Sequence, residues 1–310
     1  MPGYHVARTI EIAASPERVY EVVADYGTWT TWSPWLLADP DAKVTVSSPA
    51  NQVGSTYVWD GSITGQGELQ HRHLVAGKLV DDELRFLKPF KTTCATSFEL
   101  QPTSGGTRLT WNMQGSMPWF MFWMIPMMKT FIGMDYQRGL GMIKDWIETG
   151  SIPSRIDVRG AQPVGPLRVA GIADSTPVGL VGKKMEQTFE SARAEFAKAG
   201  IKPGTPVSVY TRFRVKQGVF DYLSGFELAS GQQLPAGTRL QLWELPAVQA
   251  FQVRHTGSYH HLGNAWSAAN QIVRCRKLKQ RSCGTFEIYR NCPGEVPDAE
   301  LITDIYLPLK

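Results

Sequence analysis

The stretch FQVRHTGSYHHLGNAW, residues 251–266, decides the fold of the C-terminal half. Its first part predicts a strand, Gln249–His255, and Gly257 marks a turn. Apolar side chains then recur at helical spacing, at Tyr259, Leu262, Trp266, Ala269 and Val273. The stretch therefore predicts a strand that turns directly into a helix.

Working outward, a strand–helix–strand–strand unit occurs twice. The first copy has a helix over residues 179–199, which Gly200 ends. A Gly-Thr pair opens the following strand in both copies, at residues 204–210 and 284–289. We expect a sheet with pseudo-twofold symmetry, both helices on one face and a groove on the other.

A second motif closes the chain: FEIYRNCPGEVPDAELITDIYLP, residues 286–308. Together with residues 251–266, it resembles the signature of gyrase-inhibitor-like (GyrI-like) effector-binding domains. The resemblance spans about residues 155–310. It implies a small-molecule-binding module of the kind that serves as a multidrug sensor in AraC-type and MerR-type regulators and also occurs alone.

Glu287 is the leading candidate for a binding residue. In a strand, it shares a face with Thr285 and Tyr289, and we expect Phe286 and Ile288 to face the helices instead. A carboxylate among aromatic side chains is costly to desolvate unless a partner compensates its charge. The resemblance matches Glu287 to the family's acidic residue, which implies a lipophilic cation as that partner. The alternative is an ordinary Glu on a solvent-facing strand.

Aromatic residues are the other ligand-binding candidates. Tyr259 and Trp266 either line the groove or pack the helix on the sheet. Further candidates, beside Tyr289, are Tyr210, Tyr222 and Trp243.

The N-terminal half predicts an antiparallel sheet and a long helix. A strand over residues 4–12 precedes a helix that Ser15 caps and Pro16 opens. Strands separated by turns follow over residues 43–113, and a helix with apolar positions from Ile132 to Ile147 ends at Gly150. The helix-grip pattern, the ASPERVY stretch at residues 14–20 and the W-x-x-W-x-P stretch at residues 29–34 resemble the START-like SRPBCC superfamily. The resemblance is to its polyketide cyclase/dehydrase branch and covers residues 4–148. The resemblance implies a hydrophobic cavity.

The predicted class is therefore α+β with two domains. Residues 1–150 form the helix-grip domain and residues 155–310 the effector-binding domain. Residues 151–166, rich in Pro and Gly, form the linker and the first strand between them.

The longest apolar run is MPWFMFWMIPMM, residues 117–128. It is too short to span a membrane, and Pro126 interrupts it. We expect the run to be buried or to line a cavity, with an interfacial segment as the alternative. No signal peptide is evident, and the four Cys read as free thiols, so we expect a cytoplasmic protein.

Metal and cofactor sites find no support in the sequence. Adjacent side chains on a helix point in different directions, so His260 and His261 cannot easily bind the same metal ion. We expect these two residues and His255 to have polar cap or surface roles. His71 and His73 could share a strand face, but no third ligand is evident. No nucleotide-binding or serine-hydrolase motif occurs, so we expect no cofactor.

The leading functional hypothesis is a protein that binds a hydrophobic small molecule, in particular a cationic aromatic one, to sense, sequester or handle it. One alternative is a hydrolase of reactive cyclopropane-bearing genotoxins that uses Glu287 and Tyr259. Another is part of a ligand-responsive transcription regulator, although the helix-grip domain occupies the place of a DNA-binding module. We therefore expect neither a nucleic-acid partner nor stable membrane insertion.

Overall fold

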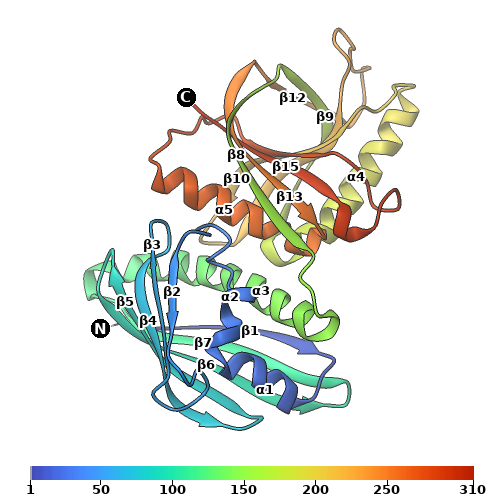
Figure 1. Ribbon diagram of the computed structural model, residues 1–310. Coiled ribbons are helices and arrows are strands. Elements are labelled where there is room, and N and C mark those ends of the chain that lie inside the picture. The colour runs from blue at the N-terminus through green and yellow to red at the C-terminus, as the bar shows by residue number, and fades with distance from the viewer. Residues whose placement is uncertain (1) are drawn as a thin grey trace. The chain divides into compact units, whose positions relative to one another are not determined.

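The computed structural model describes residues 2–310 and divides the chain into two compact units (Figure 1). The first unit ends at Ile152 and the second runs from Pro153 to Lys310. Each unit is an antiparallel sheet with helices, which confirms the predicted α+β class. No helix among the described residues is both long enough and apolar enough to cross a membrane.

The N-terminal unit is a seven-stranded sheet in the order β1-β7-β6-β5-β4-β3-β2. The strands are β1 (Gly3–Ile12), β2 (Lys43–Val46), β3 (Thr56–Gly61), β4 (Gly65–Val75), β5 (Leu79–Lys88), β6 (Thr92–Thr103) and β7 (Gly106–Ser116). Consecutive strands from β2 to β7 pair as a meander, and β1 joins at β7. The helical elements are α1 (Pro16–Ala24), η1 (Tyr26–Thr28), α2 (Trp29–Trp32), η2 (Trp119–Met124) and α3 (Ile125–Thr149).

Local sequence signals set the ends of these helices. The Ser15 side chain accepts a hydrogen bond from the backbone N–H of Arg18, and Pro16 opens α1. Gly150 ends α3 in the left-handed conformation, at a φ of 73°. Long α3 lies along the sheet in Figure 1, as the helix-grip pattern predicts.

Aromatic side chains fill the space between the sheet and α3. The ring of Trp111 stacks on Tyr136 of α3 at 4.0 Å and on Phe98 at 4.7 Å between centroids. Trp29 and Trp32 are buried against the same group. These rings pack edge-to-face and stacked at close distance, so the region next to α3, where the resemblance implies a hydrophobic cavity, is lined by large aromatic side chains.

The expectation of a buried apolar run over residues 117–128 is wrong. No residue of η2 is buried, and Trp119 is 76% exposed. The aromatic side chains of the sheet already fill the core of this unit. The short η2 segment lies at the margin of that core, where no other described element of the unit packs over its rings.

The C-terminal unit is an eight-stranded sheet in the order β12-β9-β11-β10-β14-β15-β13-β8. The strands are β8 (Ser154–Val164), β9 (Leu167–Pro177), β10 (Pro206–Arg214), β11 (Val219–Glu227), β12 (Gln241–Leu245), β13 (Val248–Gly257), β14 (Thr285–Tyr289) and β15 (Ile302–Pro308). The helical elements are η3 (Val178–Leu180), α4 (Val181–Lys198), η4 (Tyr259–His261), α5 (Leu262–Cys275) and η5 (Asp298–Glu300). Strands of the two copies occupy matching places on either side of the centre of the sheet, as a duplication requires. The matching pairs, from the centre outward, are β10 and β14, β11 and β15, and β9 and β13.

The sheet curls strongly, so that it forms its own apolar core on one face (Figure 1). Phe286 and Ile288 lie in that core with residues of β9, β10, β12 and β13. The helices α4 and α5 cover the other face. The prediction that Phe286 and Ile288 face the helices is therefore wrong, because strand alternation says which side chains share a face but not which face the helices cover.

Candidate functional site

Glu287 lies in the middle of β14, one of the two central strands of the C-terminal sheet. It pairs with Ser208 of β10 on one side and with Ile305 of β15 on the other. Its side chain is fully buried and points to the face that carries the two helices. The sheet thus holds a carboxylate in the space between α4 and α5.

Three neutral donors meet this carboxylate. The Tyr210 hydroxyl donates to Oε1 at 3.1 Å, and the Trp266 indole N–H donates to the same oxygen. The Tyr289 hydroxyl donates to Oε2. These donors come from β10, α5 and β14, so the site requires both copies of the repeat.

The charge of Glu287 has no opposite charge beside it. No Lys or Arg within residues 2–310 forms an ion pair with it. Burial raises the pKa of Glu287, and the hydrogen bonds from Tyr289, Trp266 and Tyr210 oppose that rise. Burial, followed by the Glu287 charge, raises the pKa of both Tyr210 and Tyr289 well above its usual value. The two phenols therefore stay neutral donors.

Half-buried aromatic side chains surround this cluster. Tyr259 of η4 and Phe189 of α4 approach the Tyr289 ring edge-on, with centroids at 5.6 and 5.5 Å. The Trp266 ring stands edge-on to Tyr210 at 5.0 Å. The carboxylate itself is buried beneath partly exposed rings, which form its cover toward solvent.

The remaining predicted aromatics lie farther from the carboxylate. Tyr222 of β11 is on the same face and shares a hydrogen bond of 3.0 Å with Thr188 of α4. Trp243 of β12 lies on the opposite face, where its ring contacts Phe286 at 5.5 Å. The structure therefore does not bring Trp243 to Glu287.

Helix α4 contributes residues that the sequence reasoning did not name as site residues. The Tyr210 hydroxyl lies 3.7 Å from the Met185 sulfur, and Phe189 contacts Tyr289. Met185 and Phe189 are four residues apart on α4 and so lie on the same face of the helix. The pseudo-symmetry was the available signal, since it places α4 opposite α5 across the central strands.

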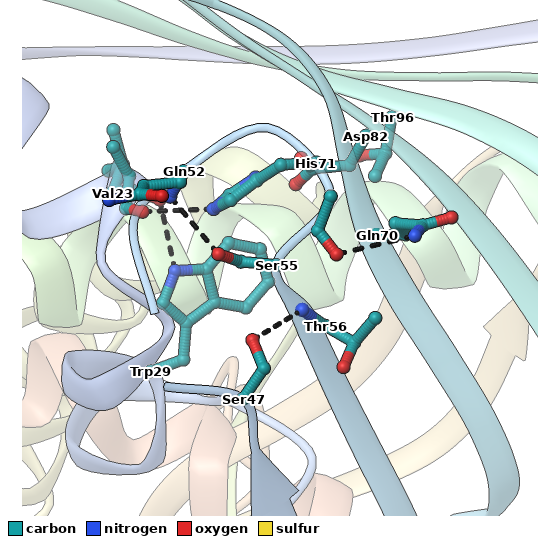
Figure 2. A network of polar contacts seen from close by, with 12 residues as sticks. Val23, Trp29, Ser47, Gln52, Ser55, Thr56, Gln70, His71, Asp82 and Thr96 are labelled. Carbon is teal, nitrogen blue, oxygen red and sulfur yellow. Dashed lines mark hydrogen bonds and ion pairs between the residues drawn. The ribbon is translucent and has the colours of Figure 1, made fainter. Parts of the chain in front are cut away.

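A second buried carboxylate lies in the N-terminal unit. Asp82 of β5 is directly opposite His71 of β4, and Oδ1 lies 2.5 Å from His71 Nδ1. Nε2 of the same ring donates to the Ala24 carbonyl at 2.9 Å, while the Tyr26 ring stacks on the imidazole at 3.9 Å. Figure 2 shows His71 between Asp82 on the sheet side and the chain around Val23. His71 is thus the partner of Asp82, and the strand register, not a sequence motif, brings the two together.

This His71–Asp82 pair compensates its own charge. Burial raises the pKa of Asp82, and the hydrogen bond from His71 opposes the rise. Nε2 donates to the Ala24 carbonyl, and Nδ1 lies within hydrogen-bond distance of Oδ1, so both ring nitrogens have a partner within the protein. The pair ties the sheet to the end of α1 and has no lone pair left for a ligand on the imidazole.

The other histidines also differ from expectation. A bulge between His71 and His73 in the pairing with β5 leaves His73 exposed, so the two side chains do not share a face. His255 and His261 are buried rather than on the surface. His255 Nε2 lies 3.0 Å from the Ser154 hydroxyl, and burial lowers the pKa of His255 to about 4.

Two open hollows lie away from Glu287. One, of about 330 Å³, is lined by His5, Val6, Ala7, Arg8, Lys129 and Thr130. The other, of about 440 Å³, is lined by Arg281, Ser282, Cys283 and Lys310. Neither touches the aromatic cluster.

Solved structures with a similar fold cover about half of the chain each. A protein from Chromobacterium violaceum is 21% identical, with a TM-score of 0.36, over 46% of this chain and 97% of that one. The Aha1 dimer from Colwellia psychrerythraea is 21% identical, with a TM-score of 0.37, over 47% and 98%. EcmrR in a complex with DNA is 17% identical, with a TM-score of 0.43, over 58% and 66%. No curated protein matches the chain.

Family models match both units. Residues 163–310 match the GyrI-like small molecule binding domain. Residues 4–148 match the model described as polyketide cyclase / dehydrase and lipid transport. The chain therefore joins two small-molecule-binding domains, one of the polyketide cyclase / dehydrase and lipid transport family and one of the GyrI-like family.

Proposed function

We propose that the C-terminal unit binds a lipophilic organic cation over Glu287 and so serves to sense, sequester or handle such compounds. One observation carries the proposal: a fully buried carboxylate is surrounded by neutral donors and has no cationic side chain beside it. Structural carboxylates at this depth are ordinarily paired with a charge. A cationic ligand would supply the missing charge.

The surrounding rings suit such a ligand. Tyr210, Trp266, Tyr259 and Phe189 present aromatic surface around one negative charge. Aromatic faces attract organic cations, and the attraction grows when the site is desolvated. The ligand would replace part of the cover formed by these half-buried rings, so binding requires side chains of α4 or α5 to move aside.

The hydrolase alternative has less support. A general base needs room for a water molecule within hydrogen-bond distance. Both carboxylate oxygens of Glu287 already accept hydrogen bonds, and Tyr259 contacts the Tyr289 ring rather than the carboxylate. The binding role therefore agrees better with the geometry.

The test compares a cation with a neutral molecule of similar shape. Isothermal titration of the full chain with tetraphenylphosphonium and with triphenylphosphine oxide measures both affinities. In Glu287→Gln we expect the affinity for the cation to fall by about 10- to 100-fold, since a desolvated charge pair is lost. The affinity for the neutral oxide should change by less than about threefold.

Glu190→Gln is the matched control, because Glu190 is an exposed carboxylate on α4, next to Phe189. It should leave both affinities unchanged. An equal loss for cation and oxide in Glu287→Gln, or a loss of cation binding in Glu190→Gln, would contradict a specific charge partner at Glu287.

A further inference from the structure

One end of the N-terminal unit exposes an unusual set of large aromatic side chains. Within residues 2–310, the exposed Phe and Trp side chains are Phe90, Trp119, Phe120, Phe122, Trp123 and Phe131. Phe90 is 80% exposed, and Phe120, Phe122 and Trp123 are each 60% exposed. Large exposed apolar patches of this kind mark surfaces that contact another phase or partner.

The strand pairing places these residues at the same end of the sheet. Ala95 of β6 pairs with Gln114 of β7, so the turn before β6, with Phe90, lies at the end where β7 runs into η2. Gly3 at the start of β1 pairs with Ser116 at the end of β7. In Figure 1 the start of α3 and the N-terminal end of β1 lie at this edge. We call this end, with residues 87–91 and 119–124, the aromatic edge.

The charged side chains of the two segments that form the aromatic edge, and of the residues next to them in the sequence, are positive. Between Glu83 and Glu99 the charged residues are Arg85, Lys88 and Lys91. Between Arg108 and Asp135 the single charged residue is Lys129. Residues 1–153 as a whole contain 12 Lys and Arg against 15 Asp and Glu, so this local positive charge runs against the balance of the unit.

These cations are free to meet an anionic partner. Lys88, Lys91, Lys129 and Arg8 form no ion pair with an acidic side chain in the part of the chain that the structure describes. Arg8 and Lys129 line the open hollow of about 330 Å³ between β1 and the start of α3. Positive charge therefore flanks the exposed rings on two sides.

Trp and Phe beside Lys and Arg match the chemistry of a bilayer surface. Trp rings prefer the level of the lipid headgroups, and Lys and Arg attract anionic lipids. The η2 segment is short and lies at the margin of the domain, which suits shallow insertion and not a membrane span. Met121 and Met124 add adaptable apolar surface between the rings.

We propose that the aromatic edge docks the protein on membranes that contain anionic phospholipid. The rings of η2 and Phe90 enter the headgroup region, and Lys88, Lys91 and Lys129 contact lipid phosphates. This surface is separate from Glu287, so it is independent of the proposed cation site.

The experiment is sedimentation of the full chain with vesicles of phosphatidylcholine containing about 30% phosphatidylglycerol, and with phosphatidylcholine alone. The unchanged protein should bind the anionic vesicles and lose that binding as salt is raised. A variant with Trp119→Ala, Phe120→Ala and Trp123→Ala should bind at least about tenfold more weakly, because it loses apolar area. Lys129→Ala should weaken binding by about fivefold.

Val53→Ala is the matched control, since Val53 is 64% exposed in the same unit but precedes β3 at the opposite end of the sheet. It should bind as the unchanged protein does. The triple variant removes exposed side chains, and an unchanged circular dichroism melting curve verifies its fold.

Three results would overturn the proposal: no binding to anionic vesicles, equal binding to neutral vesicles, or undiminished binding of the triple variant. Light scattering tests the competing occupant, a second copy of the chain. A dimer that the triple variant dissociates, without vesicle binding, would assign the aromatic edge to self-association instead.

Discussion

Two of the buried carboxylates, Asp82 in the N-terminal unit and Glu287 in the C-terminal unit, differ in the groups that surround them. Asp82 in the N-terminal unit contacts His71, whose ring also donates to the Ala24 carbonyl at the end of α1. Glu287 in the C-terminal unit faces two phenols and an indole, which donate hydrogen bonds but carry no charge. Both lie on antiparallel sheets beneath helices. Burial alone therefore does not mark a binding residue. The proposal for Glu287 rests on the combination of neutral donors and surrounding aromatic rings.

We expect the largest effect when the His71–Asp82 pair is broken. His71→Ala leaves Asp82 buried without its partner, and removing one member of a buried pair typically costs about 3–5 kcal/mol. We expect the free energy of unfolding of the N-terminal unit to fall by about that amount, measured by urea denaturation. His73→Ala, on the exposed neighbour, should cost less than about 0.5 kcal/mol. Equal small losses in both variants would mean that the pair contributes little.

A second prediction sharpens the contrast through pH. The pKa of Glu287 is raised by burial, so at a pH below that pKa a bound cation must first expel a proton. Below the pKa of Glu287 in the free protein, the cation affinity should therefore rise by up to about tenfold per pH unit. Above that pKa the carboxylate is already ionised, so the affinity should level off. Titration with tetraphenylphosphonium between about pH 5 and pH 9 measures this profile. Glu287→Gln should give a flat profile, and a sloping one would place the titrating group elsewhere.

The raised pKa of Glu287 also makes the stability of the C-terminal unit depend on pH. The direction of this dependence is opposite to that of a salt-bridged acid, whose pKa is lowered. A raised pKa means that the folded state holds its proton more tightly than the unfolded state. The stabilising contribution is fully present below the unfolded pKa and is lost as the pH rises through the folded pKa. The C-terminal unit should therefore be less stable at a pH above the folded pKa of Glu287 than below it.

We expect the smallest effect when Trp266 and Trp243, two indoles of the C-terminal unit, are replaced and their effects on stability are compared. Trp266 donates to the carboxylate, whereas Trp243 donates to the Cys283 carbonyl at 2.9 Å. Trp266→Phe should lower the free energy of unfolding by about 1–2 kcal/mol at high pH, and by less at low pH, where Glu287 is protonated. Trp243→Phe should cost about 1 kcal/mol at every pH. Denaturation at about pH 4 and pH 9 measures both, and parallel pH dependence in the two variants would contradict the assignment.

Part of the site could be predicted from the sequence. The family motif singled out Glu287, and strand alternation put Tyr289 on its face. Tyr210 is one of the aromatic candidates in the sequence, but its contact with Glu287 depends on the pairing of β10 with β14. Met185 and Phe189 could not be assigned, because a helical stripe that faces a sheet looks the same whether it covers core or a site.

The sequence by itself determined the features whose causes are local. These include the cap at Ser15 and the helix ends at Gly150 and Gly200. A helix end depends on a few neighbouring backbone groups, and such groups are adjacent in the chain.

Only the tertiary structure decided three other matters. The helices cover the Glu287 face because the sheet curls around Phe286 and Ile288 on the other. His71 meets Asp82 because of the register between β4 and β5 and the bulge beside it. The rings of η2 are exposed because Trp29, Trp32 and Trp111 already fill the core. Each outcome depends on curvature, register or volume summed over many residues, which no local pattern encodes.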